Sequence, residues 1–202
     1  MDKQKVVAVI PAYKEEKRIG RILGELKKSK KIDRIIVIDD GSKDLTYKVA
    51  ESYGIECFIC NKNYGKGHAM DLGVKISGVE IILFCDADLI GFTREMADSI
   101  LEPLLNDGIE MVIGTYRVME NNLSLWSGQR AVKRELWDRL PKFYKKGFRT
   151  ELGLNLFANS RRVIHMKYSQ EIKEKKHGFF LGLYRRFFMY LQIVSAFIRF
   201  AF

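Results

Sequence analysis

The sequence predicts an α/β protein in which a parallel sheet is covered by helices. Short runs of aliphatic, often β-branched residues recur along the first half of the chain, and each run ends in a cluster of polar residues. Between these runs, apolar residues recur at helical spacing among many charges. Strands that alternate with helices in this way form parallel sheets, because each helix returns the chain to the same end of the sheet.

The individual elements follow from the apolar spacing and from the turn residues between the runs. Pro11 closes the first apolar run, Ser42 begins the turn before the second helix, and Gly54 ends that helix. We expect strands at residues 6–11, 35–38, 55–60, 81–85 and 111–115. We expect helices at residues 13–26, 45–53, 68–77 and 93–106, and then a helix at 147–157 and a strand at 163–166.

Length and composition favour a single core. With 202 residues, 47% of them hydrophobic, the chain can bury one good core. We expect one domain over residues 1–169 and a C-terminal extension over residues 170–202. The apolar run near Met1 has only five residues, which is too short for a signal peptide, so we expect a cytoplasmic protein.

The cysteines fit a reducing compartment and no disulfide framework. Cys57 and Cys60 form a C-x-x-C, but they lie in a predicted strand. Residues three apart in a strand face opposite sides of the sheet, so we expect both to pack in the core rather than form a redox or zinc site.

The net charge of +10 is concentrated in the last third of the chain. Residues 139–202 hold 14 Lys or Arg against 3 Asp or Glu, whereas residues 1–138 hold 21 against 22. Such a basic segment indicates an anionic partner, which is a phosphorylated substrate, an anionic lipid or a nucleic acid. No nucleic-acid-binding motif supports the third, so we expect no nucleic-acid partner.

The last 25 residues, 178–202, are dense in aromatic and aliphatic side chains. Arg185, Gln192 and Arg199 are seven residues apart and would form one narrow polar stripe on a helix. The longest uncharged run, residues 187–198, is shorter than the ~20 residues that span a bilayer. We expect an amphipathic helix that either lies on the inner face of the membrane or packs on the domain or in a homodimer.

Four polar clusters follow predicted strands. They lie at residues 11–15, 39–42, 61–66 and 86–88. Open parallel sheets bind ligands beyond the carboxyl ends of their strands, so these clusters predict one site. The usual dinucleotide, P-loop, hydrolase and zinc-protease motifs are absent. The three histidines, His68, His165 and His177, are not spaced as metal ligands.

The chemistry of this site is that of a metal and a phosphate. Asp86 and Asp88 would share one face of a strand as it leaves the sheet, because alternate side chains of a strand point the same way. Two carboxylates suit a divalent cation that keeps waters and holds phosphates. Lys66, before a helix amino terminus, also favours phosphate. Together they predict a site for a nucleoside-diphosphate sugar whose glycosyl group is transferred.

Three motifs, in order, resemble the family 2 glycosyltransferases with the GT-A fold. They are VIPAYKEE at residues 9–16, VIDDGS at 37–42 and DAD at 86–88. The resemblance covers about residues 6–157 and implies a mixed, mainly parallel sheet flanked by helices. SGQRAVKRE at residues 127–135 is similar to a segment of the dolichyl- and polyprenyl-phosphate glycosyltransferases. The glucosyl-phosphoglycerate synthases are resembled less closely.

The resemblance implies that seven residues hold the donor and its metal. Those expected to line the nucleoside pocket or bind the base are Pro11, Tyr13, Glu15 and Asp40. Lys66 would contact the diphosphate. Asp86 would reach the ribose or the metal, and Asp88 would ligate Mg²⁺ or Mn²⁺ directly.

The acceptor depends on a chemical argument. A sugar hydroxyl needs a general base, whereas a phosphate is already ionised and needs none. Glu151 is the downstream acid that we nominate as a base, although it is also a typical helix-starting glutamate. Arg117, Gln129 and Arg130 are candidates to hold an acceptor phosphate. We expect a polyprenyl phosphate at the membrane as acceptor, with a soluble phosphorylated glycerate as the alternative.

Overall fold

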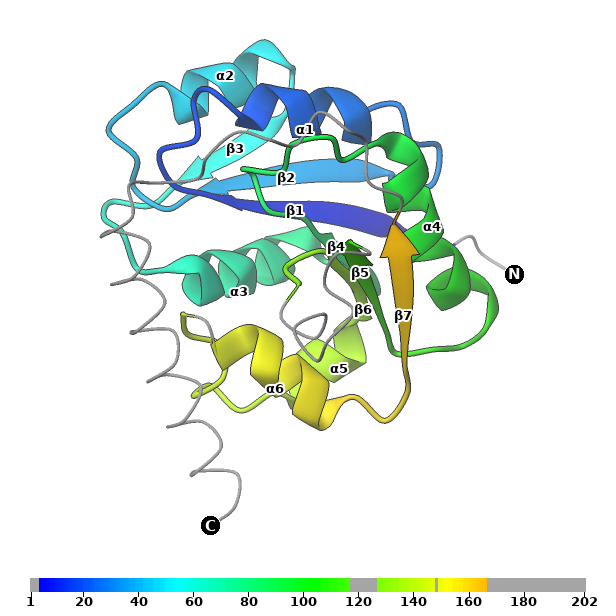
Figure 1. Ribbon diagram of the computed structural model, residues 1–202. Helices are drawn as coiled ribbons and strands as arrows, with labels where there is room; N and C mark the ends of the chain where they lie inside the picture. Colours follow the sequence, from blue (N-terminus) through cyan, green and yellow to red (C-terminus); the bar gives the residue numbers. More distant parts are fainter. Residues whose placement is uncertain (1–3, 117–126, 148, 167–202) are drawn as a thin grey trace.

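The computed structural model describes residues 4–116, 127–147 and 149–166, which form a seven-stranded sheet with helices on both faces (Figure 1). The strands are β1 (Val6–Ala12), β2 (Arg34–Asp39), β3 (Glu56–Ile59), β4 (Ile81–Phe84), β5 (Met111–Tyr116), β6 (Arg130–Lys133) and β7 (Arg161–Met166). The helices are α1 (Ile19–Leu26), α2 (Thr46–Ser52), α3 (Lys66–Ser77), α4 (Arg94–Asn106), α5 (Arg134–Arg139) and α6 (Arg149–Phe157).

The sheet is mixed but mainly parallel, with the strand order β3-β2-β1-β4-β6-β5-β7. β6 pairs antiparallel with both β4 and β5, and the other described pairs are parallel. Because β6 runs backwards, the residues before it lie at the edge where β1, β2 and β4 end. The predicted fold class is confirmed.

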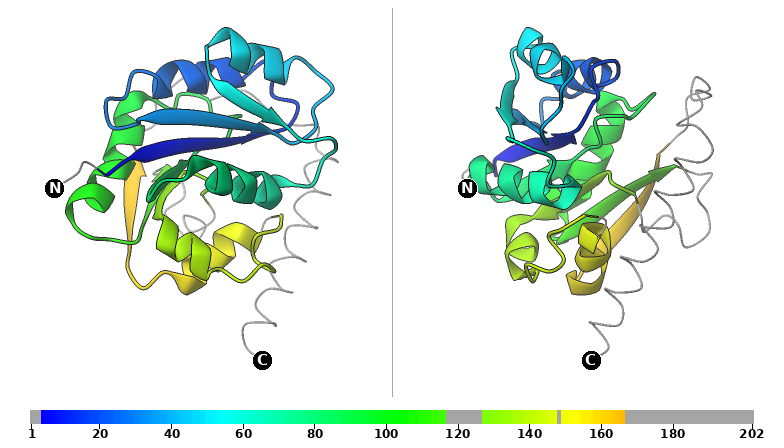
Figure 2. Two further views of the ribbon diagram at one scale, coloured as in Figure 1. Left: turned by 180° about the vertical axis from the view of Figure 1, so that it is seen from behind. Right: turned by 90° about the vertical axis from the view of Figure 1, so that its left-hand side faces the viewer.

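The core has two layers, one on each face of the sheet. Alternate residues of β1 point to opposite faces, as the pleat requires. Val6, Ala8 and Ile10 pack with the buried faces of α1 and α4, and Val7 and Val9 pack with α3, α5 and α6. Figures 1 and 2 show α1 and α2 on one side of β1–β3 and α3 on the other.

The first helix starts later than the expected residue 13. The preceding segment is held in turns by one side chain of the β2–α2 connection and one at the start of α2. The Lys14 N–H donates to Ser42 Oγ at 2.9 Å, and the Glu15 N–H donates to Thr46 Oγ1 at 2.9 Å. Lys14 also has a left-handed backbone, with φ of 59°. These contacts fix residues 13–18 outside the helix, and α1 begins at Ile19.

The strand before the paired aspartates is also shorter than expected. β4 ends at Phe84, and Asp86 and Asp88 lie in the loop that follows it. The prediction that the two carboxylates share one face of a strand is therefore wrong. They nonetheless come directly after a buried strand at the carboxyl edge of the sheet, where a ligand site was expected.

The two cysteines of the C-x-x-C lie on opposite faces, as predicted. Cys57 packs in the core layer of α1 and α4, and Cys60 packs in the layer of α3, α5 and α6. They cannot act as a pair.

Arg117, the predicted amphipathic helix at 178–202 and the extension that contains it lie outside the described residues. The division at residue 169 therefore stays a prediction. Among the described residues, no helix is both long and apolar enough to cross a bilayer.

Candidate functional site

A cleft of about 470 Å³ opens at the carboxyl ends of β1, β2 and β4. The seven residues predicted to hold the donor and its metal all line it: Pro11, Tyr13, Glu15, Asp40, Lys66, Asp86 and Asp88. Its other lining residues are Ala12, Asn63, Gly65, Ala69, Ala87 and Gly147. The structure thus brings four separate segments of the sequence to one place, as the parallel sheet predicted.

Lys66 joins two acids at the base of this cleft. Its Nζ lies 2.7 Å from Asp86 Oδ1 and 2.7 Å from Glu151 Oε1. Burial alone would lower the pKa of Lys66, but the carboxylates of Asp86 and Glu151 outweigh it and hold that pKa above its ordinary value. The lysine is therefore protonated at neutral pH and lies between two carboxylates.

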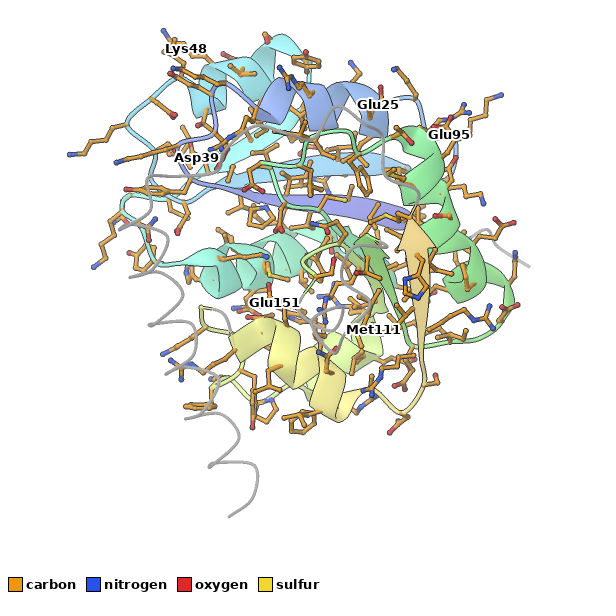
Figure 3. All side chains as sticks on the ribbon, viewed as in Figure 1. Glu25, Asp39, Lys48, Glu95, Met111 and Glu151 are labelled. Carbon is orange, nitrogen blue, oxygen red and sulfur yellow. The ribbon has the colours of Figure 1, made fainter. Side chains whose placement is uncertain are left out.

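Glu151 reaches Lys66 because α6 packs closely on the start of α3. A Cβ on Gly67 would lie 2.6 Å from Thr150 Oγ1 and 2.8 Å from the backbone nitrogen of Gly147, so only glycine allows this approach. Figure 3 shows Glu151 on the side of α6 that faces α3. The Glu151 side chain is 5% exposed. Its Oε2 is buried and has no hydrogen-bond partner in the described chain.

The segment before β6 packs against Asp86. Gln129 Nε2 donates to Asp86 Oδ2 at 3.1 Å, and Gln129 Oε1 accepts from Ser127 Oγ at 2.8 Å. A Cβ on Gly128 would lie only 2.3 Å from Asp86 Oδ2. Gln129 is buried, so in this structure it orients Asp86 rather than facing an acceptor.

Arg130 is not among the residues that line the cleft, and it is fully buried. Its guanidinium donates to the Ser127 carbonyl at 2.6 Å, to the Glu151 carbonyl at 3.3 Å and to Asn155 Oδ1 at 3.3 Å. Burial lowers the pKa of Arg130 to about 10, against the opposing charges of Glu151 and Asp86, and the group stays charged at neutral pH. Burial leaves it no surface on which to hold an acceptor phosphate. Arg130 instead fastens α6 to the segment before β6.

Asp40 shapes the loop that leads to Lys66. Its Oδ1 accepts from the Tyr64 N–H at 2.9 Å, and its Oδ2 accepts from the Gly65 N–H at 2.7 Å. Gly41 has a φ of +78°, and the backbone of Lys62 packs directly against it. A Cβ on Gly41 would lie only 2.6 Å from the Lys62 carbonyl carbon. Asp40 thus holds protein backbone in addition to lining the cleft.

The donor atoms of Asp86 and Asp88 fit Mg²⁺ or Mn²⁺. Carboxylate oxygens are the hard ligands that these cations prefer. Among the described residues, no third His, Cys, Asp or Glu joins the two aspartates in a compact group. That arrangement fits a cation that keeps open positions for water and phosphate oxygens. Asp86 already forms an ion pair with the Lys66 ammonium, so its carboxylate lies where a positive charge is stabilised.

Comparison with known proteins agrees with this geometry. Residues 7–172 match the family "Glycosyl transferase family 2". The chain belongs to this family. The family predicted from the three motifs is thereby confirmed.

The chain is also similar to individual glycosyltransferases. The chain is 41% identical over 115 residues to dolichyl-phosphate beta-glucosyltransferase of Homo sapiens, covering 49% of this chain and 35% of that protein. It is 30% identical over 161 residues to 4,4'-diaponeurosporenoate glycosyltransferase of Staphylococcus aureus, covering 74% of this chain and 38% of that protein. The chain spans half or less of the length of the curated relatives that it matches first.

A solved structure shares the fold. The crystal structure of glucosyl-3-phosphoglycerate synthase from Mycobacterium tuberculosis in complex with Mg²⁺ and uridine diphosphate superposes with a TM-score of 0.83. The two chains are 22% identical, and the match covers 97% of this chain and 79% of that one. The GT-A architecture is therefore common to both.

Proposed function

We propose that this protein is a metal-dependent glycosyltransferase that moves a sugar from a nucleoside-diphosphate sugar to a phosphorylated acceptor. Membership of family 2 supports the reaction class. The observation that carries the proposal is the pairing of Lys66 with Asp86 inside the cleft, with Asp88 beside them. A metal-bound diphosphate needs a carboxylate that suits a divalent cation and a lysine beside it, and Asp86 and Lys66 would supply these two groups.

The donor would lie along the cleft. Pro11, Tyr13, Glu15 and Asp40 line the part expected to hold the nucleoside, and Tyr13, which is 37% exposed, would offer its ring for stacking. Asp86 and Asp88 would hold Mg²⁺ or Mn²⁺, which, when bound, neutralises the negative charge that develops on the diphosphate leaving group.

Lys66 would serve the leaving group directly. The anionic oxygens of a diphosphate can replace the two carboxylates as partners of the Lys66 ammonium. The lysine would then change partners without losing a negative charge beside it. Gln129 keeps Asp86 oriented while this exchange takes place, because its own amide is held by Ser127.

We propose a polyprenyl phosphate as the acceptor. The name of the human relative includes a dolichyl phosphate, and the basic last third of the chain supports an anionic partner. The enzyme would then act in the cytoplasm, at the inner face of the membrane, with residues 178–202 as a peripheral contact or a dimer contact. A phosphorylated glycerate is the second candidate, because the solved neighbours are synthases of glucosyl-3-phosphoglycerate.

Glu151 distinguishes the two acceptors. A hydroxyl acceptor needs a base, and Glu151 would be that base. Its Oε2 has no hydrogen-bond partner in the described chain, which supports this assignment. A phosphate acceptor needs no base, and Glu151 would then act only through Lys66. Glu151→Gln should abolish transfer to a hydroxyl but reduce transfer to a polyprenyl phosphate by much less, since a general base contributes about 10²–10⁴-fold.

Calorimetric titration tests the donor site. Uridine and guanosine diphosphates are titrated with and without Mn²⁺, and we expect one of them to bind in a metal-dependent manner that Asp88→Asn abolishes. Asp138→Asn is the matched control, because Asp138 lies on α5 with a side chain that is 60% exposed. Binding that Asp88→Asn leaves unchanged would refute the metal role given to Asp88.

The acceptor is tested with the donor that binds. Sugar transfer is measured to a polyprenyl phosphate in detergent and to 3-phosphoglycerate in solution. Product with the lipid alone supports our first choice, and product with the glycerate alone replaces it. Flotation of the full chain with vesicles that contain anionic lipid tests the membrane contact separately.

A further inference from the structure

A second group of metal-ligating side chains lies beside the donor cleft. Asp40 follows β2, Cys60 follows β3, and His68 lies in the first turn of α3. One ligand atom from each residue lies within 4.8 Å of the other two. Among the described residues, no other three His, Cys, Asp or Glu come so close. Cys60 packs in the core as expected, and the spacing of Cys60 and His68 in the sequence did not indicate that they lie together with Asp40.

The histidine in this group has an unexplained polar atom. His68 Nδ1 is buried and has no hydrogen-bond partner in the described chain. A buried polar atom without a partner costs free energy, so native structures seldom leave one without a reason. Tyr64 stacks on the imidazole at 4.5 Å between ring centroids and helps to hold it in place.

The other two ligands are compatible with a cation. Both oxygens of Asp40 accept backbone N–H groups, but each keeps lone-pair capacity for a further contact. Cys60 is buried and lies on the same face of the sheet as α3. Burial, and then the carboxylates of Asp40 and Asp39, raise the pKa of the Cys60 thiol, so the sulfur stays protonated until a cation displaces the proton to solvent.

We propose that Asp40, Cys60 and His68 form a binding site for a thiophilic divalent cation such as Zn²⁺, distinct from the Asp86–Asp88 site. Thiolate, imidazole and carboxylate together suit Zn²⁺, whereas Mg²⁺ prefers oxygen ligands alone. Bonds of about 2.0–2.3 Å place tetrahedral zinc ligands roughly 3.3–3.8 Å apart. Side-chain movements of about 1 Å would therefore close the site around an ion, with water as the fourth ligand.

The position of this site predicts its effect. Asp40 lines the cleft and also holds the backbone of Tyr64 and Gly65, just before Lys66. A cation on Asp40 would occupy the carboxylate expected to bind the base and would disturb the loop that carries the lysine. Bound Zn²⁺ should therefore exclude the donor nucleotide. This consequence, unlike the cation site itself, rests on the proposed function.

Cobalt(II) tests the site in the full chain without reference to activity. The free protein is titrated with Co²⁺ alone, and we expect a sulfur-to-cobalt charge-transfer band that one equivalent of Zn²⁺ removes. Cys60→Ser should abolish the band, and His68→Gln should weaken Co²⁺ binding by at least about tenfold. Cys57→Ser is the matched control, because that thiol lies three residues away on the opposite face. Circular dichroism shows that each variant is folded.

The outcomes separate the two proposals. Absence of the band in the unaltered protein, or a band that survives in folded Cys60→Ser, would overturn the cation site. Asp88→Asn should keep the band, because Asp88 belongs to the other metal site. If the band appears but no nucleotide binds at any metal concentration, the transferase proposal fails and the cation site stands. If nucleotide binds equally well with Zn²⁺ present, the proposed exclusion is wrong.

Discussion

Replacing Lys66 with methionine removes the ammonium that joins Asp86 and Glu151. Both carboxylate oxygens lie 2.7 Å from Lys66 Nζ, so they can be no more than about 5.4 Å apart. Two unit charges at that separation repel by about 3 kcal/mol at an effective dielectric constant of about 20. The side chains of Lys66, Asp86 and Glu151 are 24%, 28% and 5% exposed, so water screens this repulsion only in part. We expect Lys66→Met to lower the free energy of unfolding by about 2–4 kcal/mol.

Urea denaturation of the metal-free protein measures this cost. Lys75→Met is the control, since Lys75 lies on the same helix with a side chain that is 69% exposed, and its pair with Asp71 should contribute less than about 1 kcal/mol. Adding Glu151→Gln to Lys66→Met removes one of the facing charges and should recover about 1–3 kcal/mol. If Lys66→Met lowers the free energy of unfolding no more than Lys75→Met does, or if the double variant is no more stable than the single one, Asp86 and Glu151 do not repel as described.

Three further predictions concern the backbone and the acid limit of stability. Gly128→Ala should displace Asp86, which a Cβ would meet at 2.3 Å, and weaken Mn²⁺-dependent nucleotide binding by about tenfold or more in calorimetry. Lys14→Asn should raise the free energy of unfolding in urea by up to about 1 kcal/mol, because asparagine tolerates the left-handed φ of 59° better than lysine. Burial opposes the charge of Glu110, but hydrogen bonds from Arg139 and from the backbone of Asn159 outweigh it and hold its pKa below the ordinary 4.5. That stability is present above pH 4.5 and is lost as the pH falls through the lowered pKa, so Glu110→Gln should flatten the acid side of a pH–stability curve.

Much of the fold could be predicted because it depends on local patterns. The buried runs of β1, β2 and β4 and the polar residues after them are visible in the sequence, and a parallel sheet places all their carboxyl ends together. The start of α1 could not be predicted in the same way. Its delay depends on Ser42 and Thr46, which bond to backbone N–H groups 28 and 31 residues earlier in the chain.

The residues that form the site could be predicted from the sequence, but the contacts between them were harder to predict. Gln129 meets Asp86 only because β6 runs antiparallel to β4 in the register that pairs Phe84 with Arg130. Lys66 meets Glu151 across 85 residues, through a close packing that Gly67 permits. The same register buries Arg130. The residues next to Arg130 in the sequence do not indicate this burial. Long-range register, rather than residue type, decided these contacts.

The place of β6 in the sheet also bears on how the chain is made. β6 lies between β4 and β5, yet it follows both in the sequence. During synthesis at about 5–20 residues per second, the 49 residues from the end of β4 at Phe84 to the end of β6 at Lys133 take roughly 2–10 s to appear. Over that interval the edge of β4 has no partner on that side, and unpaired edges are prone to wrong pairing. The last central strand to emerge thus closes the sheet, and it brings Gln129 to Asp86 in the same step.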